Sequence, residues 1–555
     1  MRNLSTILLL CAFCLTLKAQ DTNYYTPAQY LAMQTPPVFK PNNHFPRLVV
    51  DGYSRPKDLQ LLMVTNWDYC YTLQTIDAAD YGSATTDLRY FATNTSIPVS
   101  LPTPVFHADW DHGWVDDAFY CSTNGMIIDS AGNLWTNVSA NYSRRVVCPE
   151  APNSEYVHLA AIIASQISAF VTNGVNVKMI TTDGEYGLTE YGNSGTAWKK
   201  DPRVIAAMAT NGLSWARYSS IKKAHQMGII SQAIRAAAPN RDLYVYYNTG
   251  GEQTKYHASS GYTYANPWTD YGPWGFASEY MNPVSDVPVF EDYFGNCPSL
   301  SYTNGLYSNH IQDFDLLSRD LDGVGYDYAL GNHSLTYNYV NGGWSLTSAT
   351  NLSPIPEYMG FLKCLYVAGM KGAVAGFYSN PTGTNASIFG ENGFTGTFPT
   401  NIPPHWLSQI IALSRVHALF SWHEELLTNS ILTPGNGVHW TSSDQPSYEY
   451  TNNLANIYIR TLARQAIGGD TNRWLICCWA PYTDETNVIV NIPALGAVNL
   501  IARPSGAVYL ATLTALTLQD TNGLLPTEWM AESQNLAPPQ ELRILQTHLS
   551  VSTIY

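Results

Sequence analysis

The chain has 555 residues, of which 45% are hydrophobic and 13% are charged, and its formal net charge is -15. So much apolar surface can offset the entropy of folding, which excludes a disordered polar chain. The acidic balance argues against a nucleic-acid-binding protein, which needs a basic surface. The length predicts two domains, and the 38 tyrosines and 15 tryptophans favour neutral, ring-shaped ligands.

The N-terminus has the pattern of a secretory signal. A basic start precedes a short apolar run at residues 8–17, and the small residue Ala19 follows it. We predict that residues 1–19 are cleaved and that the protein is secreted or periplasmic, with no membrane segment after cleavage. A lipoprotein is disfavoured, because large side chains precede Cys11 and Cys14 where a lipobox has a small residue.

Seven cysteines lie beyond this signal, an odd number that is too sparse for a disulfide scaffold. None forms a Cys-x-x-Cys pair, which excludes a zinc ribbon. Cys477 and Cys478 are adjacent in a strand-like run, so we expect their side chains on opposite faces of a sheet.

After an N-terminal extension at 20–44, short apolar runs alternate with longer, helix-compatible segments. Ser154 and Ser214 are predicted helix caps, and Asp201-Pro202 starts another helix. This alternation predicts an α/β fold, a (β/α)8 TIM barrel over about 45–428, with a loop-like crossover between the second and third runs. The eight runs lie at 61–67, 104–110, 145–149, 177–183, 243–248, 287–292, 334–340 and 373–379, and a further helix is predicted within 404–427.

The pattern changes near residue 430. Short strand-like runs, among them RWLICCWAP, NVIVNIP and AVYLATLTALTL, follow one another with only turns between them. Such a pattern predicts antiparallel pairing. We therefore expect a separate small antiparallel β-sandwich domain at 429–555.

Carboxylates follow two of the predicted barrel strands. Asp183 and Glu185 follow the fourth run, and Glu291 and Asp292 follow the sixth. Hydrolysis of a glycosidic bond needs two carboxyl groups, one protonated and one ionised. Because function gathers at the carboxyl ends of barrel strands, we predict one catalytic carboxylate from each pair.

Other polar and aromatic residues at predicted strand ends suit a sugar groove, because an aromatic face covers the C–H face of a pyranose ring. These candidate substrate-binding residues are Trp67, His107, Asp109, Trp110, Trp114, Tyr247, Asn248, Tyr293, Trp344 and Tyr378. His107, Asp109 and His112 also have a spacing compatible with a metal, although no second histidine-rich run completes a site. We expect no metal and no cofactor. No phosphate-binding loop, dinucleotide fingerprint or Gly-x-Ser-x-Gly elbow follows a predicted strand.

The segments Asp183-Gly-Glu185-Tyr-Gly and Phe-Glu291-Asp292-Tyr293, together with the appended β domain, resemble secreted bacterial (β/α)8-barrel glycoside hydrolases. In several retaining families of this kind, the strand-four carboxylate is the nucleophile and the strand-six carboxylate is the acid/base. Another group uses strands four and seven, but run seven contains no acid. The Asp-x-Glu spacing also resembles substrate-assisted hexosaminidases and chitinases, whose further acids are replaced here by Thr181 and Thr182.

The leading hypothesis is a secreted glycoside hydrolase that cleaves a polysaccharide or oligosaccharide. A second is a glycan-binding barrel protein without catalysis, which needs the aromatic residues but no poised carboxyl pair. A third is a metal-dependent hydrolase that uses His107, Asp109 and His112.

Overall fold

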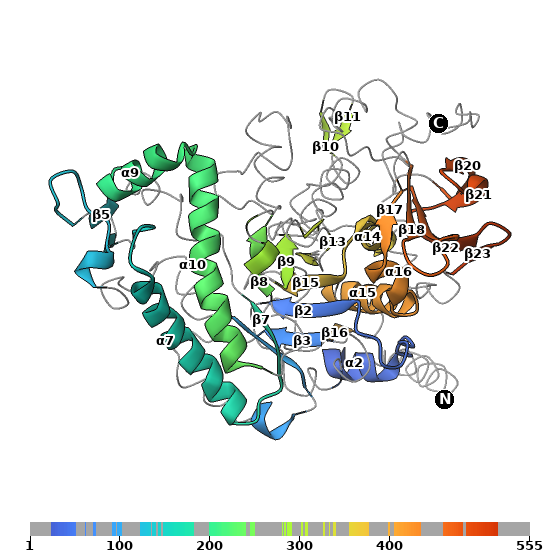
Figure 1. Ribbon diagram of the computed structural model, residues 1–555. Coiled ribbons are helices and arrows are strands. Elements are labelled where there is room, and N and C mark those ends of the chain that lie inside the picture. Colours follow the sequence, from blue (N-terminus) through green and yellow to red (C-terminus); the bar gives the residue numbers. More distant parts are fainter. Residues whose placement is uncertain are drawn as a thin grey trace, which may run out of the picture.

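The computed structural model describes a large part of the chain (Figure 1). The described residues are 24–51, 62, 70–73, 91–95, 97–102, 122–134, 136–139, 142–145, 148–181, 199–239, 245–249, 280, 282–284, 286–290, 301–303, 306–308, 326–327, 332–333, 337–339, 355–376, 398–399, 405–433, 459–480 and 484–519.

An eight-stranded sheet forms the centre of the molecule, and all its hydrogen-bonded neighbours are parallel. Its strand order is β7-β4-β3-β2-β15-β14-β9-β8. Hydrogen-bonded neighbours are therefore strands of this sheet that follow one another along the chain, apart from β15 and β2, which are the last and the first. The two outer strands, β7 and β8, also contact each other. The strands are β2 (Arg47–Asp51), β3 (Cys70–Leu73), β4 (Val99–Pro102), β7 (Val177–Thr181), β8 (Val245–Thr249), β9 (Val287–Phe290), β14 (Tyr337–Tyr339) and β15 (Gly372–Gly376).

The last five predicted runs overlap β7, β8, β9, β14 and β15, which confirms the α/β class and these approximate positions. The first three strands of the sheet, β2, β3 and β4, lie outside the predicted runs. They are short, and β4 is bounded by prolines at Pro98 and Pro102, so longer apolar runs nearby gave the stronger sequence signal.

The predicted third run, 145–149, is wrong as a barrel strand. Arg145 ends β6 (Tyr142–Arg145), which pairs antiparallel with β5 (Thr136–Ser139) in a separate hairpin. A strand of a buried parallel sheet reads as a nearly continuous apolar run, and the sequence Tyr-Ser-Arg-Arg does not. The run 61–67 precedes β3, and its described residue, Leu62, is helical. The run 104–110 follows β4 and lies outside the described residues.

Three helices lie on the left in Figure 1. They are α7 (Asn153–Thr172), α9 (Pro202–Asn211) and α10 (Trp215–Ala237). Two of them, α7 and α10, cover one side of the sheet. The predicted caps Asp201 and Ser214 are confirmed, since each accepts a hydrogen bond from a backbone N–H of the first turn. Ser154 is not a cap, because α7 already begins at Asn153 after Pro152.

The apolar faces of α7 and α10 pack on the sheet. Residues at helical spacing, such as Ala160, Ile163 and Ile167 of α7, enter a cluster with Ile230 and Ile234 of α10. The strands contribute Val99, Leu101, Val177 and Ile180 to the same cluster. By length and composition α7 could cross a membrane, and among the described helices it is the one that could; here it packs along α10.

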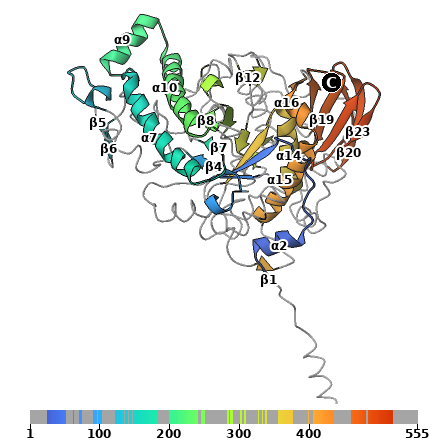
Figure 2. The same ribbon diagram turned by 60° about the horizontal axis from the view of Figure 1, so that its bottom comes forward.

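A second layer of helices separates the parallel sheet from the C-terminal strands (Figure 2). It consists of α14 (Ile355–Ala368), α15 (His405–Ser421) and α16 (Glu424–Thr428), so the predicted helix within 404–427 is interrupted at Trp422 and His423. The sequence of α14, IPEYMGFLKCLYVA, is apolar on every side, and a helix of that kind must be covered on every side. All its residues except Glu357 are buried.

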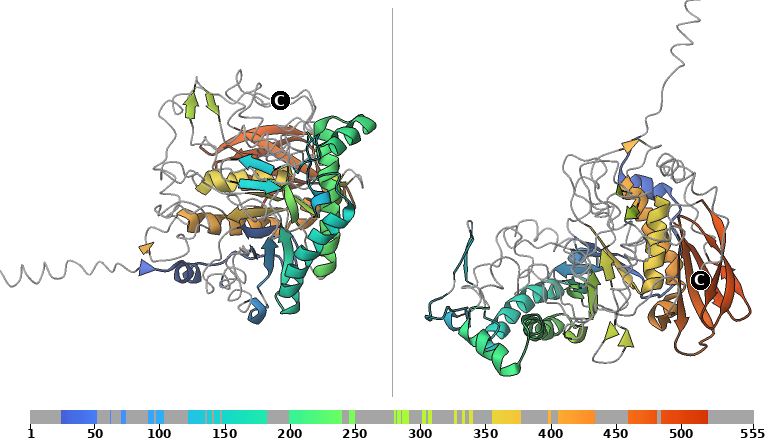
Figure 3. Two further views of the ribbon diagram at one scale, coloured as in Figure 1. Left: turned by 90° about the vertical axis from the view of Figure 1, so that its left-hand side faces the viewer. Right: turned by 90° about the horizontal axis from the view of Figure 1, so that it is seen from above.

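The C-terminal strands form two antiparallel sheets, as predicted, and lie at the far side of the molecule from α7 and α10 (Figure 3). Trp474, Ile476 and Cys478 of the larger sheet pack with Val488 and Leu500 of the smaller one. The larger sheet has β17 (Ser430–Leu432), β18 (Arg460–Ala466), β19 (Arg473–Trp479), β22 (Ala507–Thr512) and β23 (Leu516–Leu518), and the smaller has β20 (Thr486–Ile492) and β21 (Gly496–Ala502).

Shorter elements complete the described chain. In the predicted N-terminal extension, α2 (Pro27–Met33) begins with a capping box between Thr26 and Gln29, and its Tyr30 and Leu31 join the core around α14. The remaining elements are β1 (Tyr24–Tyr25), which pairs with β16 (Phe398–Pro399), the pairs β10 (Ser301–Thr303) with β11 (Leu306–Ser308) and β12 (Tyr326–Asp327) with β13 (Asn332–His333), and the 3-10 turns η1 (Thr123–Gly125) and η2 (Asn282–Val284).

Candidate functional site

The carboxyl edge of the parallel sheet is the candidate site. The fourth strand in the sheet's chain order, β7, ends at Thr181, two residues before Asp183. The sixth, β9, ends at Phe290, directly before Glu291. Parallel strands end at one edge, so the acidic segments after β7 and β9 leave the sheet on the same side.

The sheet order sets the separation of these two strand ends. β8 pairs with β9 and contacts β7, so one strand lies between the two. Neighbouring strands are about 4.8 Å apart, which places β7 and β9 about 10 Å apart across β8. Catalytic carboxyl pairs of glycosidases are separated by about 5 to 9.5 Å, which is comparable with the spacing of these two strands.

Two predicted binding residues lie on a described strand at this edge. Tyr247 and Asn248 belong to β8, between the two acidic segments, and Asn248 pairs in register with Val289 of β9. The other predicted site residues lie outside the described residues: Trp67, His107, Asp109, Trp110, His112, Trp114, Asp183, Glu185, Glu291, Asp292, Tyr293, Trp344 and Tyr378. His107, Asp109 and Trp110 follow the third strand, β4, and not the second as predicted, and Trp67 precedes β3.

Sequence reasoning missed Asp51. It is the last residue of β2 and pairs in register with Gly376, the last residue of β15, which places it at the same edge. The sequence Arg-Leu-Val-Val-Asp is itself a short apolar run that ends in an acid, so the signal used for the other strands could have found it.

A second missed carboxyl is Glu357, in the first turn of α14. Ala368 at the end of α14 leads within a few residues into the amino end of β15. A helix of this length spans about 20 Å, so its first turn lies toward the carboxyl side of the sheet. Glu357 is half-buried, and desolvation by its surroundings raises the pKa of its carboxyl to about 8. An acid inside an otherwise apolar helix was the available signal.

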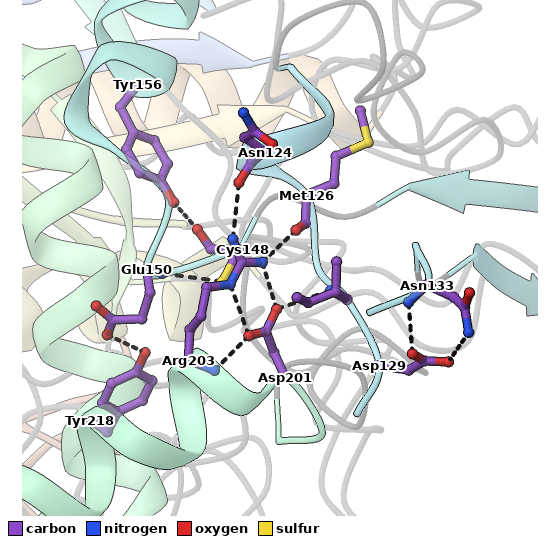
Figure 4. Close-up of polar contacts among 11 residues, drawn as sticks. Asn124, Met126, Asp129, Asn133, Cys148, Glu150, Tyr156, Asp201, Arg203 and Tyr218 are labelled. Atoms are coloured by element: carbon purple, nitrogen blue, oxygen red, sulfur yellow. Dashed lines mark hydrogen bonds and ion pairs between the residues drawn. The ribbon is translucent and has the colours of Figure 1, made fainter. Parts of the chain in front are cut away.

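The beginnings of α7, α9 and α10 are joined by a polar network, drawn in Figure 4. The buried carboxylate of Asp201 accepts hydrogen bonds from the backbone N–H of Arg203, from two guanidinium nitrogens of Arg203 and from the Ile128 N–H, at 2.7 to 3.0 Å. Arg203 also donates to the carbonyl oxygens of Asn124 and Met126. Burial alone would raise the pKa of Asp201, but these hydrogen bonds outweigh it and hold the pKa below its ordinary value.

Glu150 links the same region to α10. Its carboxylate accepts a hydrogen bond from the Tyr218 hydroxyl at 2.7 Å and forms an ion pair with Lys222 at 2.8 Å. Burial, reinforced by this carboxylate, raises the pKa of Tyr218. Burial also raises the pKa of Cys148 to about 12, so its thiol is not a nucleophile near neutral pH. The network therefore positions the starts of these helices and is not itself a reactive centre.

The described residues contain no group of three or more His, Cys, Asp or Glu side chains that could hold a metal ion. His107, Asp109 and His112 lie outside that part of the chain.

Comparisons with known proteins return glycoside hydrolases among solved structures. The catalytic domain of β-amylase from Paenibacillus polymyxa aligns at 11% identity with a TM-score of 0.33, over 59% of this chain and 91% of that one. The exo-β-1,4-mannosidase from Opitutaceae bacterium strain TAV5 aligns at 11% identity with a TM-score of 0.38, over 70% of this chain and 62% of that one. The glycoside hydrolase family 30 subfamily 8 xylanase from Clostridium acetobutylicum aligns at 9% identity with a TM-score of 0.33, over 86% of this chain and 99% of that one. No family model and no curated protein matches the chain, and these similarities assign it to no family.

Proposed function

We propose that this protein is a glycoside hydrolase whose active site lies at the carboxyl edge of the parallel sheet. The observation that carries the proposal is the position of β7 and β9 in one parallel sheet with β8 between them, each followed directly by an acidic segment. That arrangement of the two strands supports the proposal that carboxylates far apart in sequence meet at one edge, where a sugar ring would bind between them.

Each acidic segment has one role in this mechanism. Asp183 or Glu185 supplies the nucleophile, or the base that activates water, and Glu291 or Asp292 donates a proton to the departing glycosidic oxygen. A carboxyl separation near 5 Å gives retention of configuration, and 6.5 to 9.5 Å gives inversion. Tyr247 and Asn248 belong to β8, the strand between β7 and β9, and are the candidates on that strand for contact with the sugar.

The proposal includes a closed barrel and export. The contact between β7 and β8 supports closure of the sheet into a (β/α)8 barrel, because these are its two outer strands. The basic start, apolar run and Ala19 of the N-terminus support cleavage of a signal and a secreted or periplasmic protein that acts on polysaccharides or oligosaccharides.

Near-isosteric substitution of the acids tests the site. Asp183→Asn, Glu185→Gln, Glu291→Gln and Asp292→Asn are compared with the wild type on a panel of polysaccharides, with product analysis. We expect one variant from each pair to lower kcat by about 10²- to 10⁴-fold, the usual contribution of acid–base catalysis. The matched control is Glu485→Gln, the same chemical change on an exposed side chain in the C-terminal sheets. Four variants with wild-type turnover would place the active site elsewhere.

The pH dependence separates an enzyme from a binding protein. An enzyme with one ionised and one protonated carboxyl gives a bell-shaped profile of kcat/KM, and loss of one carboxyl removes one limb. Sugar binding without turnover by the wild-type protein on every polysaccharide would instead support the glycan-binding alternative. Loss of turnover on chelation, restored by a divalent metal, would support the alternative based on His107, Asp109 and His112.

A further inference from the structure

Two cysteines face each other where α14 meets the larger C-terminal sheet. Cys364 lies in the third turn of α14 and Cys477 lies in the middle of β19, and their sulfur atoms are 3.5 Å apart. Both side chains are fully buried, and both belong to the same apolar cluster. The two sulfurs are therefore in van der Waals contact inside the molecule.

Two glycines bring the backbones together at this point. Gly360 lies one turn before Cys364, and Gly506 directly precedes β22, the strand that pairs with β19. A Cβ atom on Gly506 would lie 3.1 Å from the Gly360 Cα and 3.5 Å from the Cys477 sulfur. The absence of side chains at both positions lets the helix approach the sheet closely beside the thiol pair.

A buried lysine fixes the position of the helix along the sheet. Lys363, next to Cys364, donates hydrogen bonds from its Nζ to the carbonyl oxygens of Ser505 and Gly506 at 2.8 and 3.0 Å. Bonds from a charged donor hold the helix in one register, so the contact between the two sulfurs is a fixed feature of the packing.

The other described cysteine side chains have different surroundings. Cys478 faces the opposite side of β19, as predicted, where its sulfur accepts a hydrogen bond from the Thr461 hydroxyl and packs with the smaller C-terminal sheet. Cys148 lies near the beginning of α7, in a third cluster. Among the cysteines whose side chains the structure describes, Cys364 and Cys477 are therefore placed to react with each other.

We propose that Cys364 and Cys477 form a disulfide bond that links α14 to the C-terminal sheet. The two thiols each lose a proton and together lose two electrons to a disulfide oxidant, either glutathione disulfide or a protein disulfide, which leaves as two thiols. Formation of the bond brings the sulfurs from 3.5 Å to about 2 Å. Because both thiols are buried in the folded protein, the exchange occurs before the helix and sheet are fully docked.

This disulfide goes beyond the proposed activity and does not depend on it, but it rests on the proposed export, because disulfides persist in oxidising compartments. It would close a loop between residues 113 positions apart, which restricts the unfolded chain and raises the thermal midpoint, Tm. It would also make the contact between the two parts of the molecule sensitive to reductant.

Mass spectrometry of the wild-type chain tests the proposal directly. The full chain is produced in an oxidising compartment and in a reducing cytosol, and each sample is denatured with an alkylating reagent, without reductant, and digested. We expect a cross-linked pair of peptides containing Cys364 and Cys477 from the oxidising compartment, and both residues alkylated in the cytosolic sample. Alkylation of both residues in the sample from the oxidising compartment would overturn the proposal.

Thermal unfolding gives a second, independent measurement on the material from the oxidising compartment. Dithiothreitol should lower the Tm of the wild type by several degrees and leave the Tm of Cys477→Ser unchanged. The matched control is Cys478→Ser, which removes the adjacent buried thiol on the opposite face and should retain the full response to dithiothreitol. A wild-type Tm that does not respond to reductant would contradict the proposal.

Discussion

At the scale of single residues, Asp201 shows how one side chain joins two segments far apart in the sequence. Its carboxylate caps α9, pairs with Arg203 and accepts the backbone N–H of Ile128, and it is completely buried. A buried carboxylate is tolerated because hydrogen bonds satisfy both of its oxygens. The Asp-Pro pair in the sequence revealed the cap, but nothing in the sequence indicated the contact with Ile128, 73 positions away.

Replacement of this charge should cost stability in a pH-dependent way. Asp201→Asn keeps the shape and a good capping residue but turns an NH₂ group toward donors, and we expect it to lower the free energy of unfolding by about 2 kcal/mol at pH 7. The folded pKa lies below the ordinary 3.8, so the stabilising contribution is complete above that pH and is lost as the pH falls through the folded pKa. Urea unfolding from pH 7 to pH 2.5 measures both effects.

The control for this prediction is Asp470→Asn, on an exposed turn where the side chain accepts one hydrogen bond from the Asn472 N–H. It should leave the free energy of unfolding nearly unchanged. If the difference in free energy of unfolding between the wild type and Asp201→Asn stays constant down to pH 2.5, the charge of Asp201 is not the cause of that difference.

At the scale of secondary structure elements, sequence patterns located the long elements better than the short ones. The helix α10 and the strands of the C-terminal sheets were predicted because their periodicity extends over many residues. The strands β3 and β4 lie beside longer apolar runs, which were chosen instead, whereas the equally short β9 was found because it lies inside such a run. Because of this error, His107 and Asp109 were assigned to the second strand, although they follow the third, β4. The acids after β7 and β9 were assigned to the correct strands because β7 and β9 lie within strongly apolar runs.

Two helical glycines give opposite predictions for the same substitution. A Cβ on Gly360 of α14 would overlap with the Trp479 Nε1 and the Pro504 carbonyl oxygen, whereas a Cβ on Gly228 of α10 would lie 3.4 Å from a Val284 methyl group. Gly360→Ala must therefore separate the helix from the sheet, and we expect it to lower the free energy of unfolding by about 1–3 kcal/mol. Gly228→Ala should be neutral or stabilising by up to about 1 kcal/mol, because alanine favours helix. Urea unfolding of both variants checks the sign, and equal effects would contradict the packing of α14 described here.

At the scale of the whole molecule, one hydrophobic core extends across the predicted domain boundary at 428/429. The cluster around α14 and α15 includes Leu462, Leu475 and Val508 of the C-terminal sheet. The fully buried Arg464 of β18 donates to the carbonyl oxygens of Val367 and Ala368, the last of α14, and so caps a helix of the other part. Removal of either part would expose apolar surface and leave these buried polar groups without partners, which opposes separate folding.

We therefore expect one cooperative unfolding transition for the two parts. Two matched substitutions test this at opposite ends of the molecule: Ile163→Ala in α7, and Ile492→Ala in β20, both at fully buried side chains. Each should lower the free energy of unfolding by about 2–5 kcal/mol, because apolar burial is lost and a cavity is left behind. In scanning calorimetry the wild type should give a single endotherm, and both variants should shift that same endotherm to lower temperature, because a shared core transmits the loss from either end. Two endotherms, each lowered by only one of the variants, would show instead that the parallel sheet and the C-terminal sheets unfold independently and that the core around α14 does not couple them.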